Sequence, residues 1–333
     1  MKLLITGACG FIGTNFILRY VKNHPEDEII NVDKLTYAAN KKVNNLLTGN
    51  KRYNFIQEDI CNYPAMEEIM KGVDVVVHFA AESHVDRSIQ NPEIFLKTNI
   101  FGTHSLLEAA LKNNVKRFHH VSTDEVFGEL SLEGEEKFTE NTQYDPRSPY
   151  SASKAASDHL VRSYYATYGL PVTTSNCSNN YGPFASPEKF IPRSITNLLQ
   201  NTPIKIYGDG KYIRDWLFVE DHCIAIETII EKGRVGETYL VGGLTKDITN
   251  LELAEMLLEI TGKDKSYIEF IKDRPGHDKR YSVDWTKLNK ELGWTPTLTL
   301  RTGLEKTVEW YKNNEEFWNE AKKVAEKFYS QNV

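Results

Sequence analysis

The sequence predicts an α/β protein with a doubly wound parallel sheet, followed by a smaller, mixed α/β C-terminal lobe. Three observations predict this fold. An apolar strand at residues 2–7 runs directly into the glycine loop GACGFIG. Strand-like and helix-like segments then alternate as far as about residue 178, which favours parallel strands joined by right-handed crossovers. Beyond that point prolines interrupt the alternation and the elements become shorter.

The glycine loop predicts a dinucleotide site and makes the first part of the fold Rossmann-type. Gly7 allows the tight turn after the strand, Gly10 lets the backbone approach a pyrophosphate, and Gly13 lets the following helix pack against the strand. The second strand, EIINVDK, ends at Asp33, twenty residues beyond Gly13. A carboxylate there accepts hydrogen bonds from a ribose diol and repels a 2′-phosphate. The pattern therefore favours NAD over NADP.

The remaining strands are expected at residues 52–60, 73–81, 115–123 and 170–178. The third strand ends at Asp59, which can meet an adenine amine or cap the helix that begins near Pro64. Ala80 and Ala81 follow the fourth strand, and their small side chains let the backbone lie against a cofactor. A long helix is expected over residues 91–114.

We expect a NAD-binding domain over residues 1–178 and a smaller lobe over residues 179–333 that closes one side of a cleft. Residues 218–243, approximately, are expected to return to the first domain. In the lobe, helices are expected at 188–200, at 250–262 and from about 301 to 328, and a strand at 203–210. The aromatic residues of the last helix are expected to serve packing.

Composition excludes several classes of function. The net charge is −6 and the isoelectric point about 5.9, which argues against nucleic-acid or anionic-membrane partners. The four cysteines are far apart and form no CxxC pair, so we expect thiols in a reducing compartment and no metal site. No run is long and apolar enough for a membrane span, so we expect a soluble, cytoplasmic protein.

Catalytic chemistry is predicted between residues 121 and 154. Thr123, Asp124 and Glu125 follow the fifth strand, at the edge of the sheet where open α/β sheets bind ligands. Tyr150 and Lys154 are four residues apart and share a helix face, where an ammonium can lower the pKa of a phenol. Each feature alone is common on ordinary turns and helices. Together, downstream of a nucleotide loop, they predict an acid, a base and a nucleotide in one site.

The motifs resemble those of the extended short-chain dehydrogenase/reductase family, and within it the dTDP-glucose 4,6-dehydratases. The matching segments are GACGFIG at 7–13, DKLTYA at 33–38, AAESHVDRS at 80–88, STDEVFG at 122–128, YSASKAASD at 150–158, NNYGP at 179–183, PEKFIP at 187–192, RDWLFVEDH at 214–222 and RPGHDKRY at 274–281. They span nearly the whole chain, so the resemblance is far more specific than its glycine loop.

The resemblance implies a hydro-lyase that oxidises and re-reduces its own substrate. Tyr150, aided by Thr123 and Lys154, would take the C4 hydroxyl proton of the glucosyl unit while the C4 hydride passes to NAD. Glu125 would then remove the C5 proton as Asp124 protonates the departing C6 hydroxyl. Return of hydride to C6 and of a proton to C5 leaves dTDP-4-keto-6-deoxyglucose, a precursor in deoxysugar pathways such as dTDP-rhamnose synthesis. Because one step needs an acid and a base together, the two carboxyls should differ in protonation.

The resemblance also implies that the lobe over residues 179–333 mainly binds the nucleotide sugar, and it assigns binding residues. With the three glycines of the loop included, the cofactor residues are Gly7, Gly10, Phe11, Ile12, Gly13, Asp33, Lys34, Leu35, Thr36, Asp59, Ile60, Phe79, Ala80, Ala81, Ser83, Thr98, Tyr150, Lys154 and Asn180. The substrate residues are Ser83, Thr123, Asn179, Lys189, Phe190, Lys205, Ile206, Tyr207, Arg214, Asn250, Asp273, Arg274, Pro275, Gly276 and His277. Arginines suit the diphosphate because a guanidinium binds phosphate oxygens in pairs.

Two alternatives stay open at this point. One is a related enzyme, either a 4,6-dehydratase acting on a UDP- or GDP-sugar or an epimerase. Epimerases lack the acidic pair because they eliminate nothing, so Asp124 and Glu125 discriminate against them. The other is a non-catalytic NAD-binding sensor, which predicts erosion of Tyr150, Lys154 or the acidic pair, and all of these residues are present. The resemblance further implies a homodimer, formed through the helix around Thr98 to Asn113 and the Tyr150 helix.

Overall fold

A seven-stranded parallel sheet forms the centre of the protein in the computed structural model, which describes residues 1–243, 246–273 and 276–332. In sheet order the strands are β11 (Thr238–Val241), β6 (Val172–Cys177), β5 (Arg117–Thr123), β4 (Val75–His78), β1 (Lys2–Thr6), β2 (Glu28–Asp33) and β3 (Tyr53–Gln57). The first strand, β1, lies inside the sheet. The chain adds β2 and β3 on one side of β1, and then β4, β5, β6 and β11 on the other side. This is the doubly wound order, so the predicted fold class is confirmed.

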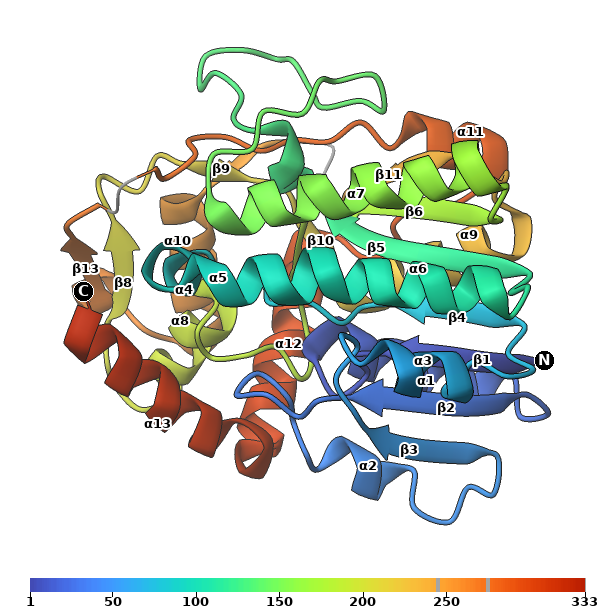
Figure 1. Ribbon diagram of the computed structural model, residues 1–333. Helices are drawn as coiled ribbons and strands as arrows, with labels where there is room; N and C mark the ends of the chain where they lie inside the picture. Colours follow the sequence, from blue (N-terminus) through green and yellow to red (C-terminus); the bar gives the residue numbers. More distant parts are fainter. Residues whose placement is uncertain (244–245, 274–275, 333) are drawn as a thin grey trace.

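Alternation along the strands sends buried side chains to both faces of the sheet. Leu4 and Val76 pack on one face and Leu3 and Val75 on the other. The first face is covered by α3 (Tyr63–Ile69), α6 (Thr103–Lys112) and α7 (Pro149–Tyr168), which lie in front of the sheet in Figure 1. The second is covered by α1 (Phe11–Asn23) and α9 (Val219–Lys232), with α11 (Thr286–Leu292) against β11. The sheet is therefore buried on both sides.

The expected long helix over residues 91–114 is helical but not uniform. It comprises α5 (Pro92–Phe95), a π-helical segment η1 (Leu96–Gly102) and α6. The wider turn places Asn99 so that its side-chain amide donates to the Glu82 carbonyl and its oxygen accepts from the Glu82 N–H, at 3.0 and 2.9 Å. The π segment thereby ties the helix to the loop after β4.

The second lobe packs around its own apolar core. It contains β7 (Asn179–Tyr181), α8 (Phe190–Leu199), β8 (Ile204–Tyr207), β9 (Ile213–Arg214), β10 (Trp216–Phe218), β12 (Ile248–Thr249), α10 (Asn250–Thr261), β13 (Ile268–Ile271), α12 (Leu300–Asn313) and α13 (Glu315–Asn332). Three two-stranded pairs, β10–β7, β12–β9 and β13–β8, connect these helices. Ile195, Leu257 and Leu304 are fully buried among them. The connections of the protein also contain the short helices α2 (Val43–Leu46) and α4 (Val85–Gln90) and the 3₁₀ turns η2 (Asp124–Phe127) and η3 (Lys265–Tyr267).

One detail differs from the expected elements: the last helix is two helices, because the chain turns at Asn314 between α12 and α13. Within residues 218–243, which were expected to return to the first domain, α9 packs against α1 and β11 pairs with β6 as a seventh strand. The boundary at residue 178 stays a prediction. Within the described part of the chain, no helix has both the length and the apolar composition that crossing a bilayer requires.

Candidate active site

The carboxyl ends of the parallel strands face the second lobe, and a cavity of about 980 Å³ lies between them. Loops after β1, β2, β4 and β5 form one side of it. Segments around α8, β8 and α13 form the other. The volume is at the upper end for a small-molecule site, as a dinucleotide together with a second ligand requires.

The glycine loop forms a cradle that side chains would fill. Gly7 has φ of +75°, and a Cβ on it would lie 2.6 Å from the Ala80 nitrogen. A Cβ on Gly13 would lie 2.5 Å from the Gly7 carbonyl oxygen. Only glycine fits at these two positions, so the close packing of the loop, α1 and the β4 loop depends on them. The residues present therefore fit a dinucleotide.

Asp33, at the end of β2, is fixed by the backbone around it. One carboxylate oxygen accepts from the Cys9 N–H at 2.9 Å and the other from the Leu35 N–H at 2.8 Å. Burial raises the pKa of Asp33, and these two hydrogen bonds act in the opposite direction. Asp59 is paired with Lys34 at 2.6 Å. Both carboxyls line the cavity beside the glycine loop.

The structure brings the predicted cofactor residues together. All nineteen residues named above as cofactor contacts line the cavity: Gly7, Gly10, Phe11, Ile12, Gly13, Asp33, Lys34, Leu35, Thr36, Asp59, Ile60, Phe79, Ala80, Ala81, Ser83, Thr98, Tyr150, Lys154 and Asn180. Their roles stay predictions.

Most predicted substrate residues also line the cavity: Ser83, Thr123, Asn179, Lys189, Phe190, Lys205, Tyr207, Arg214, Asn250 and His277. Ile206, Asp273 and Gly276 are not among the described residues that line it. Ile206 points into the core because side chains alternate along β8, and Asp273 accepts a hydrogen bond from the Tyr212 hydroxyl. Arg274 and Pro275, which were also predicted to bind the substrate, lie outside the described residues.

The end of β5 delivers the acidic pair. Thr123 caps the 3₁₀ turn η2: its hydroxyl accepts from the Glu125 N–H and donates to Asp124 Oδ1, both at 3.3 Å. Thr123 and Glu125 line the cavity, whereas Asp124 is 1% exposed and is not among the described lining residues. The Glu125 carboxyl therefore lies at the cavity, and the Asp124 carboxyl is buried behind the cavity wall.

The surroundings of Asp124 favour its neutral form. Burial, followed by the charges of Glu125 and Asp215, raises its pKa well above the usual range. Its Oδ2 atom is fully buried and, among the described residues, has no hydrogen-bond partner. This is the direction that the predicted difference in protonation requires.

Tyr150 and Lys154 project from the first turns of α7. A capping box formed by Ser148 and Ser151 fixes the start of that helix. The Lys154 ammonium donates to the Val121 carbonyl at 2.9 Å. The expected lowering of the Tyr150 pKa is not found in the chain alone. Burial and the charge of Glu125 raise the pKa of Tyr150 well above its usual value, and the hydrogen bond with Thr123 opposes them only in part.

One wall of the cavity was not predicted from the sequence. Phe317, Val324 and Tyr329 on α13 line it, so Tyr329, which was expected to serve packing, also faces the cavity. Its hydroxyl donates to the Glu188 carbonyl at 2.9 Å. No signal in the sequence could have shown this, because an amphipathic pattern identifies a buried face without naming what it covers.

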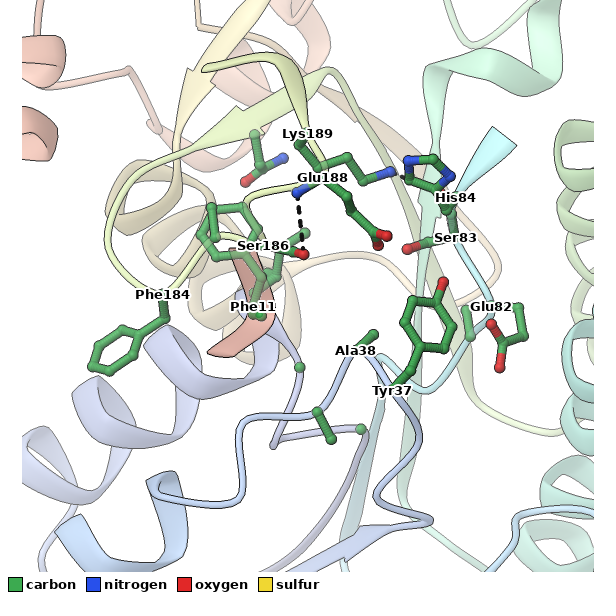
Figure 2. Close-up of a pocket in the computed structure, with 18 of the residues that line it drawn as sticks. Phe11, Tyr37, Ala38, Glu82, Ser83, His84, Phe184, Ser186, Glu188 and Lys189 are labelled. Carbon is green, nitrogen blue, oxygen red and sulfur yellow. Dashed lines mark hydrogen bonds between the residues drawn. The ribbon is translucent and has the colours of Figure 1, made fainter. Parts of the chain in front are cut away.

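Tyr37 and Glu188 were also missed, although both lie in segments that carried the resemblance. Figure 2 shows Tyr37 rising from the loop after β2, with its hydroxyl directed toward Ser83 and Glu188. Lys189 reaches across the same space and donates to the Ser83 carbonyl at 2.8 Å. The cofactor side and the lobe side of the cavity are thus in direct contact here.

Comparison with known proteins decides the family. A model of the family described as GDP-mannose 4,6 dehydratase matches residues 4–307. The dTDP-glucose 4,6-dehydratase 1 of Escherichia coli K12 is 48% identical, with 98% of this chain and 96% of that protein covered. The enzyme of the same name from Haemophilus influenzae is 49% identical, with 94% and 98% covered. The chain belongs to the dTDP-glucose 4,6-dehydratases.

Solved structures agree with this placement. DesIV, a dTDP-glucose 4,6-dehydratase from Streptomyces venezuelae crystallised with NAD, is 43% identical and superposes with a TM-score of 0.93, covering 96% of this chain and 100% of that one. A UDP-glucuronic acid 4-epimerase from Bacillus cereus superposes almost as well, with a TM-score of 0.88 at 30% identity over 94% and 99% of the chains. The fold is therefore shared with epimerases. Sequence identity distinguishes the dTDP-glucose 4,6-dehydratases from them.

Proposed function

We propose that the protein converts dTDP-glucose to dTDP-4-keto-6-deoxyglucose with NAD as its cofactor, in deoxysugar biosynthesis such as that of dTDP-rhamnose. The observation that carries this proposal is the set of groups around the end of β5. A threonine, a tyrosine, a lysine and a carboxyl line one cavity, and a neutral carboxylic acid lies directly behind them. An epimerase has no use for the acidic pair. Relatives at 48–49% identity over nearly the whole chain carry the same activity in their names.

The nicotinamide of NAD, when bound, supplies an acceptor for two electrons and gives them back before the product leaves. The chain would hold the dinucleotide along the glycine loop. Asp33 would accept hydrogen bonds from the ribose diol, and the backbone at Ala80 and Ala81 would lie against the dinucleotide.

The residues of β5 and α7 then divide the proton transfers. Tyr150 removes the proton of the C4 hydroxyl, with the Thr123 hydroxyl as its hydrogen-bond partner and Lys154 beside it. Glu125, which reaches the cavity, removes the proton at C5 once C4 is a ketone, and a proton returns to C5 after the elimination. Asp124, which burial keeps protonated, gives its proton to the departing C6 hydroxyl so that water leaves. A small inward movement of the Asp124 side chain is required for this last contact.

The lobe supplies the cations for the nucleotide diphosphate. Arg214 lines the cavity, and its guanidinium is fixed by donating to the Ile213 and Asp278 carbonyls, each at 2.7 Å. Its central carbon also lies 4.5 Å from the ring centre of Tyr281. A guanidinium held in one orientation suits diphosphate oxygens better than a mobile one. Lys205 lies on the same side of the cavity.

We further infer a homodimer. Large apolar side chains are exposed on the helices that the resemblance implicates: Leu96 (42%) and Phe101 (66%) on η1, and Tyr168 (57%) on α7. α7 lies alongside α6 and η1, so these exposed side chains are on neighbouring helices. Two copies related by a twofold axis would cover it in a four-helix interface. Sedimentation velocity should give a single species of two chains, and a monomer at micromolar concentration would contradict the inference.

The proposed reaction has a direct test in dTDP-glucose carrying deuterium at C4. We expect a 4-keto product, recognised by its absorbance in alkali, whose new C6 methyl group carries that deuterium. UDP- and GDP-glucose serve as matched controls, and we expect slower turnover with both. A product whose methyl group lacks the label, or no product at all, would contradict the proposal.

A further inference from the structure

A buried carboxylate, Asp158, lies behind the catalytic residues of α7. It is 5% exposed, and it is not among the described residues that line the cavity, whereas Tyr150 and Lys154 are. The three residues are spaced by four along α7, so their side chains follow one another on one face of the helix. An ionised group in such a place is stable only if its hydrogen bonds and its charge are matched.

Three donors converge on Asp158 from three different parts of the chain. His120 on β5 lies 3.1 Å from Oδ1 through its Nε2 atom. Asn176 on β6 donates to Oδ2 at 3.0 Å, and the Tyr144 hydroxyl donates to the same atom at 2.9 Å. The carboxylate is therefore held rigidly, and its position is fixed relative to the sheet.

The charges around Asp158 identify Lys154 as its electrostatic partner. Burial lowers the pKa of His120 to about 4, and it lowers that of His78, whose ring lies 5.2 Å from His120, well below the usual value. Both imidazoles are neutral at pH 7. Burial raises the pKa of the Cys177 thiol and of the Tyr144 phenol, so these are neutral too.

Two cations remain on α7 near the carboxylate. Arg162, one turn further along the helix, is exposed and screened by water. Lys154 is 4% exposed. Burial lowers the pKa of Lys154, and the charge of Asp158 counteracts part of that effect. Burial raises the pKa of Asp158, but the His120 hydrogen bond and the charge of Lys154 outweigh burial, so that the pKa of Asp158 is lowered.

The same network reaches the end of β5. The Asn176 amide that binds Asp158 also donates to the Thr123 carbonyl at 3.1 Å. Lys154 in turn donates to the Val121 carbonyl, two residues earlier on that strand. Asn176 thus links Asp158 to the backbone of Thr123, although Asp158 is not among the described residues that line the cavity.

We propose that Asp158 is a positioning residue for the first proton transfer, and that its carboxylate keeps Lys154 charged and Thr123 in place beside Tyr150. Only the expected effect on kcat rests on the proposed function. The charge on Lys154 can be measured without substrate.

The test is Asp158→Asn, which keeps the shape of the side chain and removes its charge. We expect the pKa of Lys154 to fall by about one unit or more, because the ammonium loses the neighbouring carboxylate that offsets its burial. The pKa is read from ¹³C NMR of lysine-labelled protein, with the Lys154 signal assigned by its loss in Lys154→Arg. In the pH profile of kcat, the alkaline limb should move to lower pH by a similar amount.

Two control variants separate charge from packing. Tyr144→Phe removes one hydrogen bond and keeps the carboxylate, so the Lys154 pKa should stay at its wild-type value. Asp158→Glu also keeps the charge and should leave the alkaline limb where it is, even if kcat falls. An unchanged Lys154 pKa in Asp158→Asn, or an equal shift in Asp158→Glu, would overturn the proposal.

Thermal melting checks that each variant is folded, and Asp158→Ser provides a second neutral variant for the same titration if Asp158→Asn does not fold. Absence of a 4-keto product with the wild-type protein would instead overturn the proposed function, and it would leave the lysine titration as it is. The two failures are therefore distinguishable.

Discussion

Tyr150→Phe is expected to lower kcat for dTDP-glucose roughly a thousandfold, because the phenol is the group placed to take the first proton. Tyr150 is 7% exposed and lines the cavity, and its hydroxyl has Thr123 as a partner. Phenylalanine fills the same space, so binding of NAD and of the nucleotide sugar should change little. Stopped-flow absorbance at the wavelength of reduced nicotinamide measures the step directly, and we expect no signal within the wild-type turnover time.

Thr123→Val is the matched control for this prediction. It removes the hydroxyl that hydrogen-bonds Tyr150 and Asp124 but keeps the base itself. We expect a loss of about ten- to a hundredfold, with the acid limb of the pH profile moved to higher pH because the phenolate loses a hydrogen bond. A Tyr150→Phe enzyme that still reduces NAD at the wild-type rate would exclude the phenol as the base.

The sheet could be predicted because its signals are local. Each strand is a short apolar run, and the glycine loop and Asp33 mark the ends of two of them. Parallel strands meet at one edge, so residues at successive strand ends had to lie together. The same reasoning placed Thr123 and Glu125 in the cavity with Tyr150 and Lys154.

The remaining features depend on contacts between distant parts of the chain. The π segment at Leu96–Gly102 differs from a regular helix by the path of a few hydrogen bonds, and a 3.6-residue pattern does not resolve that. The burial of Asp124 behind the wall depends on the turn η2, and the pKa of Tyr150 depends on how completely α7 covers it. The position of α13 over the cavity follows from the packing of the second lobe. The sequence of α13 does not indicate which part of the protein it packs against.

Asp124→Asn is expected to stop the elimination while leaving the earlier steps intact. The amide is isosteric with the protonated acid that burial favours at this site, but it has no proton to give to the departing hydroxyl. We expect kcat to fall by about two to four orders of magnitude. Reduced nicotinamide should accumulate on the enzyme with dTDP-glucose, and the C5 proton should still exchange with solvent deuterium, because Glu125 is unaltered.

Glu125→Gln is the matched control for the acid, because it removes the base from the same turn. Reduced nicotinamide should again accumulate, but exchange at C5 should be lost. The pair of variants therefore separates the two carboxyls by a single NMR measurement. Exchange lost in Asp124→Asn and kept in Glu125→Gln would reverse the assignment of acid and base.

The raised pKa of Asp124 also predicts how the stability of the protein depends on pH. A carboxyl whose pKa is higher in the folded than in the unfolded state contributes stability that is complete below its unfolded pKa, and this contribution is lost as pH rises through the folded pKa. An asparagine amide cannot ionise, so the Asp124→Asn variant should match the wild type at acidic pH and melt at a higher temperature than it as pH increases. Thermal melts from about pH 4 upward, near the unfolded pKa of an aspartate, measure this difference. A gap that stays constant with pH would show that the buried carboxyl is not the neutral acid that the elimination needs.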